Sequence, residues 1–310
     1  MNIDFDIELN FAIFKPVLEK RPEINTDTLK KDLQNYYLPF IQKLINLKQQ
    51  KNTNDGIIVG VSAIQGVGKT TQGEILEILL DHFGYSSVSL SIDGHYITHK
   101  QLNELREKDP RYIRRGVTHD IPLAIQNLTD LRKMTAGQEV KIPIYNKGAF
   151  DGDGDRDGWK TVTKKPEFIF YDGWMLGARK VEDESVFESG LPALDSAEHI
   201  QFAKDINKRL VEYEPLWQLF DFFTVLYVPH YQISLKWRDQ AEDRLRAEGK
   251  GMNHEEIREF IYYFWRSVHP AIHVKHLAQD EVHTNQVVII NDDHTVKEVL
   301  SPVQTKEKYP

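Results

Sequence analysis

The sequence from Gly56 to Thr71 reads GIIVGVSAIQGVGKTT and decides the fold. Its first half is a nearly continuous apolar run rich in β-branched residues, which is typical of a strand buried on both faces of a sheet. Its second half is a glycine-rich turn, and the segment QGEILEILLDHF that follows repeats apolar residues at helical spacing. Strand, turn and helix in this order predict a phosphate-binding loop of the Walker A pattern Gly-x-x-x-x-Gly-Lys-Ser/Thr.

The match to this pattern has one departure. Gly68, Lys69 and Thr70 fill its last three positions, whereas Ala63 stands where the pattern has its first glycine. The backbone N–H groups of such a turn point at phosphate oxygens, and the helix N-terminus adds partial positive charge. We therefore expect Lys69 to reach the β- and γ-phosphates of ATP and Thr70 to hold Mg²⁺. The residues expected to bind the nucleotide are Gly66, Val67, Gly68, Lys69, Thr70 and Thr71.

The rest of the chain alternates short apolar runs with amphipathic stretches, which predicts an α/β fold with a parallel sheet covered by helices on both faces. Residues 25–50 have helical periodicity that Pro39 should kink or divide. We expect a helical extension over 1–52 and a main domain over 53–310. The predicted strands are 56–63, 86–92, 167–172, 222–228 and 286–291, and the predicted helices between them are 69–83, 119–136, 195–212 and 232–248.

The composition limits the classes of function. The chain has 310 residues, a formal net charge of −8 and no cysteine, so thiolate chemistry and disulfides are excluded. An acidic protein lacks the basic field that a nucleic-acid or membrane surface needs, so we expect neither partner. The first residues have neither a signal-peptide nor a transit-peptide pattern, and no apolar run is long enough to span a bilayer. We expect a monomeric cytoplasmic protein.

Two aspartates follow predicted strands. Asp93 ends the strand in SLSIDGHY, and Asp172 ends the strand in EFIFYDGW. Ligands bind at the carboxyl ends of strands in open α/β sheets. Asp93 is therefore a candidate general base for a substrate hydroxyl, and Asp172 fits the Walker B position that orders Mg²⁺. The alternative for Asp93 is a helix cap or the start of an Asp-Gly turn.

The stretch YNKGAFDGDGDRDGWK, residues 145–160, resembles a calcium loop at first sight. A calcium EF-hand needs glycine at position 6 and glutamate at position 12, where this chain has Arg156 and Val162. The pattern favours a loop over an acceptor molecule, in which Lys147 and Arg156 meet an anion and Asp155 holds the guanidinium of Arg156. Calcium binding and a solvated loop without function are the alternatives.

With these residues in place, the chain resembles the phosphoribulokinase, uridine kinase and pantothenate kinase group of P-loop kinases, and within it the D-glycerate 3-kinase family and its fungal relatives. The matching segments run from about 36 to 290 and include VGVSAIQGVGKTT, SLSIDGHYIT, RGVTHDIPL, YNKGAFDGDGDR, YDGWMLGAR and WRDQAEDRLRAEGKG. The resemblance implies a three-layer P-loop sandwich with five parallel strands in the order 2-3-1-4-5. It also implies Mg-ATP as donor and a small hydroxy acid, D-glycerate, as acceptor.

The resemblance assigns roles to residues that match the family's motifs. It implies that Asp93 is the base, that Asp172 is the Walker B carboxylate, and that Lys69 and lid residue Arg238 stabilise the transferring phosphoryl group. It implies an acceptor loop over about 94–160 and a lid over about 232–275. The matched acceptor residues are Thr118, His119, Asp120, Lys147, Asp155 and Arg156.

Three arginines in YIRRG, namely Arg111, Arg114 and Arg115, precede the Thr-His-Asp motif, and we choose Arg115 to bind an acceptor carboxylate. The loop from Arg115 to Asp120 is shorter than the family's. Three functions stay open: a glycerate kinase, a kinase of another hydroxylated metabolite such as a nucleoside or pantothenate, and a non-catalytic ATP-binding regulator.

Overall fold

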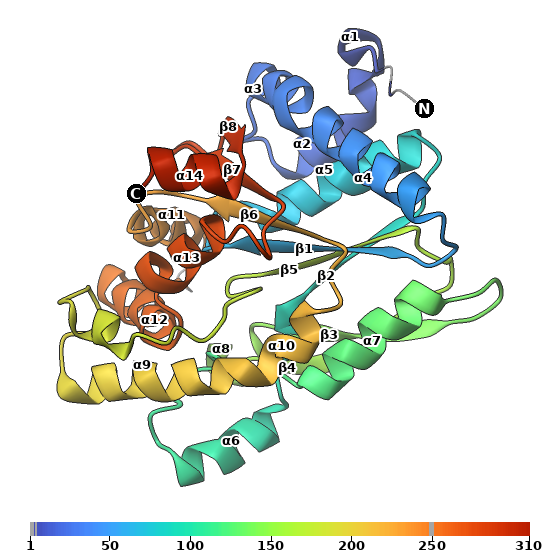
Figure 1. The fold of residues 1–310 in the computed structure, drawn as a ribbon. Coiled ribbons are helices and arrows are strands. Elements are labelled where there is room, and N and C mark those ends of the chain that lie inside the picture. The colour runs from blue at the N-terminus through green and yellow to red at the C-terminus, as the bar shows by residue number, and fades with distance from the viewer. Residues whose placement is uncertain (1–2, 4, 248–250) are drawn as a thin grey trace.

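The computed structural model describes residues 3, 5–247 and 251–310. It shows a central sheet with helices packed on both of its faces (Figure 1), which confirms the predicted α/β architecture. The helices α4 and α5 cover one face, and α7, α9 and α10 cover the other. The helices are α1 Ile7–Asn10, α2 Lys15–Lys20, α3 Thr26–Asp32, α4 Leu38–Lys51, α5 Lys69–His82, α6 His99–Lys108, α7 Ile121–Lys133, α8 Ala149–Gly152, α9 Ala197–Arg209, α10 Glu214–Trp217, α11 Ile233–Ala247, α12 His254–Ser267, α13 Lys275–Ala278 and α14 Pro302–Lys308.

The sheet has six strands in the order β2-β5-β1-β6-β7-β8. The five parallel strands follow the predicted order. The sheet has one strand more than predicted, since β8 is added at its edge and pairs antiparallel with β7. The sequence VKEVL of β8 mixes charged with apolar residues, as a half-exposed edge strand does, and lacks the continuous apolar run of the buried strands. The strands of this sheet are β1 Ile57–Ala63, β2 Ser87–Ser91, β5 Phe168–Gly173, β6 Phe222–Tyr227, β7 Gln286–Ile290 and β8 Val296–Leu300.

The register of the sheet fixes what lies at its carboxyl edge. β5 lies between β1 and β2, and its residue Asp172 is paired with Val61 on one side and with Ser91 on the other. The phosphate loop begins two residues beyond Val61, and Asp93 lies two residues beyond Ser91. Parallel pairing therefore brings the loop and both carboxylates to one edge, because parallel strands all end on the same side.

The N-terminal helices pack against α5 and share the hydrophobic core of the sheet. The helix predicted over 25–50 is divided, but the division precedes the proline. A π-helical turn, Leu33–Tyr37, joins α3 to α4, and Pro39 lies in the first turn of α4. Proline is tolerated there because the N–H groups of a first turn have no intrahelical partner.

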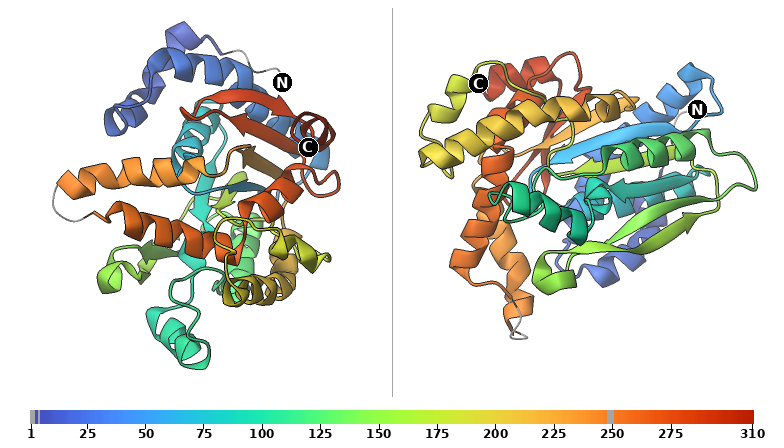
Figure 2. Two further views of the ribbon diagram at one scale, coloured as in Figure 1. Left: turned by 90° about the vertical axis from the view of Figure 1, so that its left-hand side faces the viewer. Right: turned by 90° about the horizontal axis from the view of Figure 1, so that it is seen from below.

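Two insertions extend from the carboxyl edge. The region predicted as an acceptor loop is largely regular, with α6, α7 and an antiparallel hairpin of β3 Val140–Asn146 and β4 Asp155–Val162. The region predicted as a lid contains α11 and α12, and its residues 248–250 lie outside the described residues. The lid helices and the hairpin extend on the same side of the molecule (Figure 2, left). Among the described residues, no helix is both long and apolar enough to cross a membrane.

A half-buried carboxyl group joins the N-terminal helices to the edge of the sheet. Asp32, at the end of α3, accepts a hydrogen bond from the Val296 N–H at 3.2 Å. Burial raises the pKa of Asp32 to about 6. The hydrogen bond from Val296 lowers this pKa, and the negative charge of Asp293 raises it further. Since this pKa lies above the unfolded value of 3.8, the native state holds the proton over that interval, and stability falls as pH rises from about 4 to 6.

We expect Asp32→Asn to remove this loss, because an amide oxygen still accepts the Val296 N–H and carries no charge. The variant should be more stable than wild type by about 1–2 kcal/mol at pH 7.5, a figure reduced for the partial exposure of the carboxyl group, and equal to it at about pH 4. Urea unfolding at both pH values measures the difference. A difference that is the same at both would contradict this account.

Candidate active site

The phosphate loop has the backbone that its glycines predict. Gly66 and Gly68 have φ values of +85° and +101°, which residues other than glycine rarely adopt. A Cβ atom on Gly66 would lie 2.8 Å from the Cβ of Trp237 on α11, so this glycine also lets the lid helix approach the loop. The loop thus forms an open cradle of backbone amides at the start of α5, bounded on one side by the lid.

Lys69 lies at the base of this cradle. Its amino group donates to the carbonyl oxygens of Ala63 and Ile64, both at 3.1 Å. Burial lowers the pKa of Lys69, and the carboxylates of Asp172 and Asp93 act in the opposite direction. Among the described residues, no side chain accepts a hydrogen bond from this amino group. Only main-chain oxygens hold it, so it can also form a charge-assisted hydrogen bond with an anion.

The two aspartates lie in different electrostatic settings. Burial raises the pKa of Asp172 to about 6, the nearby Lys69 lowers it, and Asp93 raises it further. Asp93 is more exposed, and its carboxylate pairs with the amino group of Lys147 at 3.0 Å. Lys147 comes from the hairpin, with 76% of its side chain exposed, so the pair is easily opened. The edge of the sheet therefore carries two cations and two carboxylates.

A cleft of about 810 Å³ joins the phosphate loop, both carboxylates, the hairpin and the lid. Its size suits a nucleotide's phosphates together with a small second molecule. Of the predicted site residues, the cleft is lined by Gly66, Gly68, Lys69, Thr70, Thr71, Asp93, Arg115, Lys147, Asp172 and Arg238.

The lid contributes an arginine and an aromatic wall. The guanidinium of Arg238 donates to the buried carboxylate of Glu242, and its carbon lies 4.9 Å from the ring centroid of Phe260 on α12. Trp237 donates to the carbonyl of Asp292 at 2.9 Å and stacks on His294, which ties α11 to the loop after β7. Arg238 is therefore held at the cleft wall, and the lid stays a prediction.

The Thr-His-Asp motif forms a layer behind the cleft wall. The Thr118 hydroxyl donates to the Arg115 carbonyl at 2.5 Å. His119 stacks on Tyr96, and its Nδ1 lies 2.8 Å from the Tyr213 hydroxyl. Burial lowers the pKa of His119 to about 3, although Asp93 opposes the shift. A neutral His119 thus packs under Tyr96, and acceptor binding by this motif stays a prediction.

The predicted pairing of Asp155 with the guanidinium of Arg156 is wrong. Arg156 instead donates to the carboxylate of Asp120 at 2.9 Å and to the Tyr96 carbonyl at 2.8 Å. Asp155 accepts the backbone N–H of His99 and that of Arg156 itself. The reason is geometric: adjacent residues of a strand point to opposite faces, so neighbouring side chains cannot readily form a fork.

The acidic stretch uses its aspartates to order the hairpin. Asp153 accepts two hydrogen bonds from Arg106 at 2.7 and 2.9 Å, and Asp157 accepts one from Asn146. The ring of His99 also lies 3.1 Å from the Asp153 carboxylate, and the backbone N–H of His99 donates to Asp155, so these two carboxylates hold the start of α6. Among the described residues, no group of three His, Cys, Asp or Glu side chains is placed to hold a metal ion. Arg106 and His99 were not recognised from the sequence, because their partners lie some fifty residues away.

Arg115 also orders the hairpin. Its guanidinium donates to the carbonyls of Asp153, at 2.9 Å, and of Ile97 and Gly154. Only 4% of Arg115 is exposed. The sequence predicts that this residue binds an acceptor carboxylate, whereas in the structure each of its three nitrogens already donates to a main-chain oxygen.

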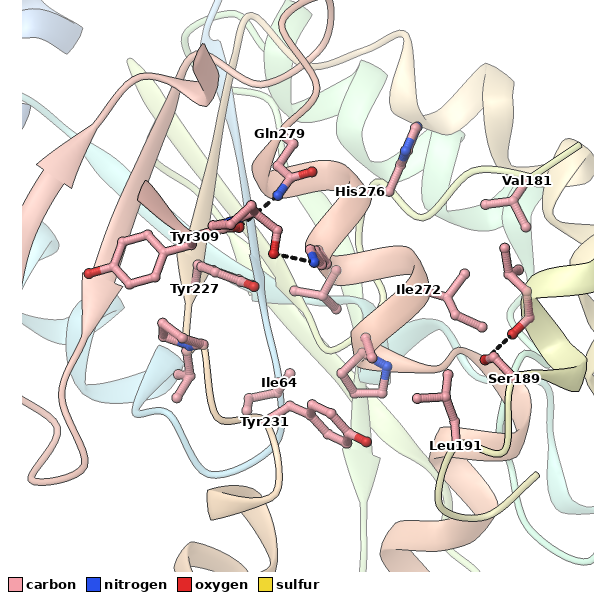
Figure 3. Close-up of a pocket in the computed structure, with 18 of the residues that line it drawn as sticks. Ile64, Val181, Ser189, Leu191, Tyr227, Tyr231, Ile272, His276, Gln279 and Tyr309 are labelled. Carbon is pink, nitrogen blue, oxygen red and sulfur yellow. Dashed lines mark hydrogen bonds between the residues drawn. The ribbon is translucent and has the colours of Figure 1, made fainter. Parts of the chain in front are cut away.

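A second cavity, of about 1090 Å³, lies on the other side of the phosphate loop (Figure 3). Ile64 reaches it from the loop, Tyr227 and Tyr231 from the region of β6, and Ile272 and His276 from the segment before β7. It contains neither Lys69 nor the two edge carboxylates. We therefore place the chemistry in the smaller cleft.

The chain is similar to known kinases. No family model matches the chain. The chain is 32% identical over 250 residues to a chloroplastic D-glycerate 3-kinase of Arabidopsis thaliana, a match that covers 75% of this chain and 53% of that protein. It is 31% identical to the uncharacterized kinase mug58 of Schizosaccharomyces pombe, over 70% of this chain and 81% of that one. The solved structure of a Cryptococcus neoformans D-glycerate 3-kinase superposes with a TM-score of 0.73 at 25% identity, covering 84% of this chain and 96% of the other.

The role of Arg115 can be measured directly. We expect Arg115→Met to free the hairpin tip, because three carbonyls lose a charged donor. Amide hydrogen exchange at residues 147–154 should become about 10- to 100-fold faster, with exchange in α5 unchanged. Arg111→Met, which removes a guanidinium from the same loop, is the matched control and should leave the tip protected. Unchanged exchange at the tip in Arg115→Met would contradict the assignment.

Proposed function

Because the chain belongs to the family of D-glycerate 3-kinase and related P-loop kinases, we propose that it transfers the γ-phosphoryl group of ATP to a hydroxyl of a small hydroxy acid, D-glycerate. The observation that carries the proposal is the meeting of Lys69 and Asp93 in one cleft at the edge of the sheet. A lysine for phosphates and an exposed carboxylate for a hydroxyl are the two groups that such a transfer needs. Monomeric state and cytoplasmic location stay predictions from the sequence.

The residues present fit Mg-ATP. The glycine backbone of the phosphate loop leaves room for phosphate oxygens, and the Lys69 amino group has only carbonyl partners. Thr70 and Asp172 would hold Mg²⁺, since a hydroxyl and a carboxylate are oxygen ligands of the kind that this ion takes. Mg²⁺, when bound, neutralises charge on the phosphates.

The protein's own residues would act by position and charge. Asp93 accepts the proton of the acceptor hydroxyl while that oxygen forms its bond to the γ-phosphorus, and the bond from this phosphorus to the bridging oxygen of ADP breaks. Lys147 has to leave Asp93 as the hydroxyl arrives, which its exposure allows. Lys69 and Arg238 stabilise the negative charge that spreads over the transferred group.

The lid would exclude water from this step. Trp237 already touches the phosphate loop at Gly66, and Arg238 is the next residue of the same helix. Closure of α11 and α12 over the nucleotide would therefore bring Arg238 to the phosphates and limit ATP hydrolysis without an acceptor.

The test is ADP release from Mg-ATP in the presence of D-glycerate, other hydroxy acids, nucleosides and pantothenate. We expect turnover with D-glycerate. Asp93→Asn should lower kcat by about 10²- to 10⁴-fold with nucleotide affinity retained, because the carboxylate acts on the acceptor. Lys69→Met should lower both kcat and nucleotide affinity, because the amine acts on the phosphates.

Each other result has a defined meaning. Turnover with a different acceptor alone would replace the substrate and keep the mechanism. ATP binding without stimulation by any acceptor would favour the regulator. Full activity of Asp93→Asn would remove Asp93 from the role of base.

A further inference from the structure

The three arginines before the Thr-His-Asp motif have very different surroundings. Each of the three nitrogens of the Arg115 guanidinium donates to a main-chain oxygen, two of them in the hairpin. Arg111 is paired with Asp109 at 2.8 Å and with Asp205 at 2.9 Å. Arg114 is half-buried and lines the cleft, yet no carboxylate pairs with its guanidinium among the residues that the structure describes. One of the three is therefore available to an anion, and it is Arg114.

Arg114 shares an aromatic platform with the lid arginine. The guanidinium carbons of Arg114 and Arg238 each lie 4.9 Å from the ring centroid of Phe260. Burial lowers the pKa of Arg114, Asp153 opposes this shift, and the nearby positive charge of Arg238 adds to it. Arg238 is neutralised by the buried carboxylate of Glu242, whereas the guanidinium of Arg114 has no carboxylate partner among the described residues. A partly buried cation beside a second cation is unfavourable without an anion of its own. The arrangement is that of a receptor for negative charge.

A row of aromatic side chains connects this receptor with the catalytic carboxylate. Tyr96 follows Asp93 in the same helical turn, and its hydroxyl accepts a hydrogen bond from the Trp174 indole at 3.0 Å. Trp174 packs against Phe264 with ring centroids 4.8 Å apart, and Phe264 packs against Phe260 at 4.9 Å. Asp93 and Arg114 both line the cleft that these rings wall, so a carboxylate for a hydroxyl and an unpaired guanidinium face the same space.

We propose that Arg114 binds the carboxylate of the acceptor and makes the enzyme specific for anionic hydroxy acids over neutral polyols. This proposal rests on the proposed function. It adds Arg114 as the group that recognises the negative charge of the acceptor. A guanidinium suits this task, because its planar donors match a carboxylate bidentately. Arg238, on the same Phe260 platform, is left for the phosphates. The division explains why two arginines share one ring.

The decisive comparison is between D-glycerate and glycerol, which differ by the carboxylate. We expect Arg114→Met to raise the KM for D-glycerate by about 10- to 100-fold, since a charge-assisted bidentate contact is lost. The KM for ATP and the kcat/KM for glycerol should stay within about twofold of wild type. Arg114→Lys keeps the charge without the fork and should recover part of the selectivity. Arg258→Met is the matched control, because it removes an exposed guanidinium, paired with Glu255, from the helix that carries Phe260.

Equal losses with D-glycerate and glycerol would overturn the proposal and assign Arg114 to the phosphoryl group. An unchanged KM for D-glycerate in Arg114→Met would overturn it as well. Thermal unfolding and nucleotide titration establish that each variant is folded, and Arg114→Lys carries the test if Arg114→Met is not.

Calorimetric titration of D-glycerate in the presence of a non-hydrolysable ATP analogue separates this inference from the proposed function. If wild type binds D-glycerate without phosphorylating it, and Arg114→Met does not bind it, the kinase assignment fails while the receptor stands. If wild type phosphorylates D-glycerate and Arg114→Met binds it equally well, the receptor fails while the kinase assignment stands. A wild type that neither binds nor phosphorylates D-glycerate contradicts both.

Discussion

At the centre of the sheet, β1 forms parallel ladders with β5 on one side and β6 on the other, and the active cleft depends on this pairing. Since side chains alternate along a strand, a slip of one residue would turn Asp172 away from the phosphate loop. The register instead places Asp172 level with Val61 and Ser91, so the loop after β1 and the turn after β2 flank it. The hydrophobic core that fixes the register of the strands therefore also fixes the positions of the charged groups in the site.

The charges at this edge depend on one another. Lys69 lowers the pKa of Asp172, while Asp172 and Asp93 oppose the loss of charge on Lys69, so each group lessens the cost of burying the other. Lys147 balances Asp93 from the hairpin. The two lysines and the two aspartates thus offset one another's charge. In the proposed reaction, phosphate and hydroxyl groups would take over this balance, and the site would be preorganised for the charge that develops.

The hairpin shows a different use of charge. Arg106 and Arg115 hold the turn that contains Asp153 and Gly154 through carboxylate and carbonyl oxygens. What resembles a calcium loop in the sequence is a tip whose acidic and main-chain oxygens bind arginines. Of the cations from the hairpin and the preceding loop that line the cleft, Arg114 has no carboxylate partner among the described residues, and Lys147 pairs with Asp93.

The sequence alone determined the five parallel strands, their order through the family resemblance, the phosphate loop and the positions of Asp93 and Asp172. These features depend on local apolar patterns and on motifs that are continuous in the chain, so they can be recognised before folding is considered. The sixth strand escaped recognition, because its half-exposed pattern has no strong period. Only the tertiary structure decided which arginine of the loop keeps an unpaired guanidinium at the cleft and which partner holds Arg156. The partners of Arg115 and Arg106 lie up to 47 residues away in sequence, and the pairing of long flexible side chains depends on which acidic groups and carbonyls folding brings within reach.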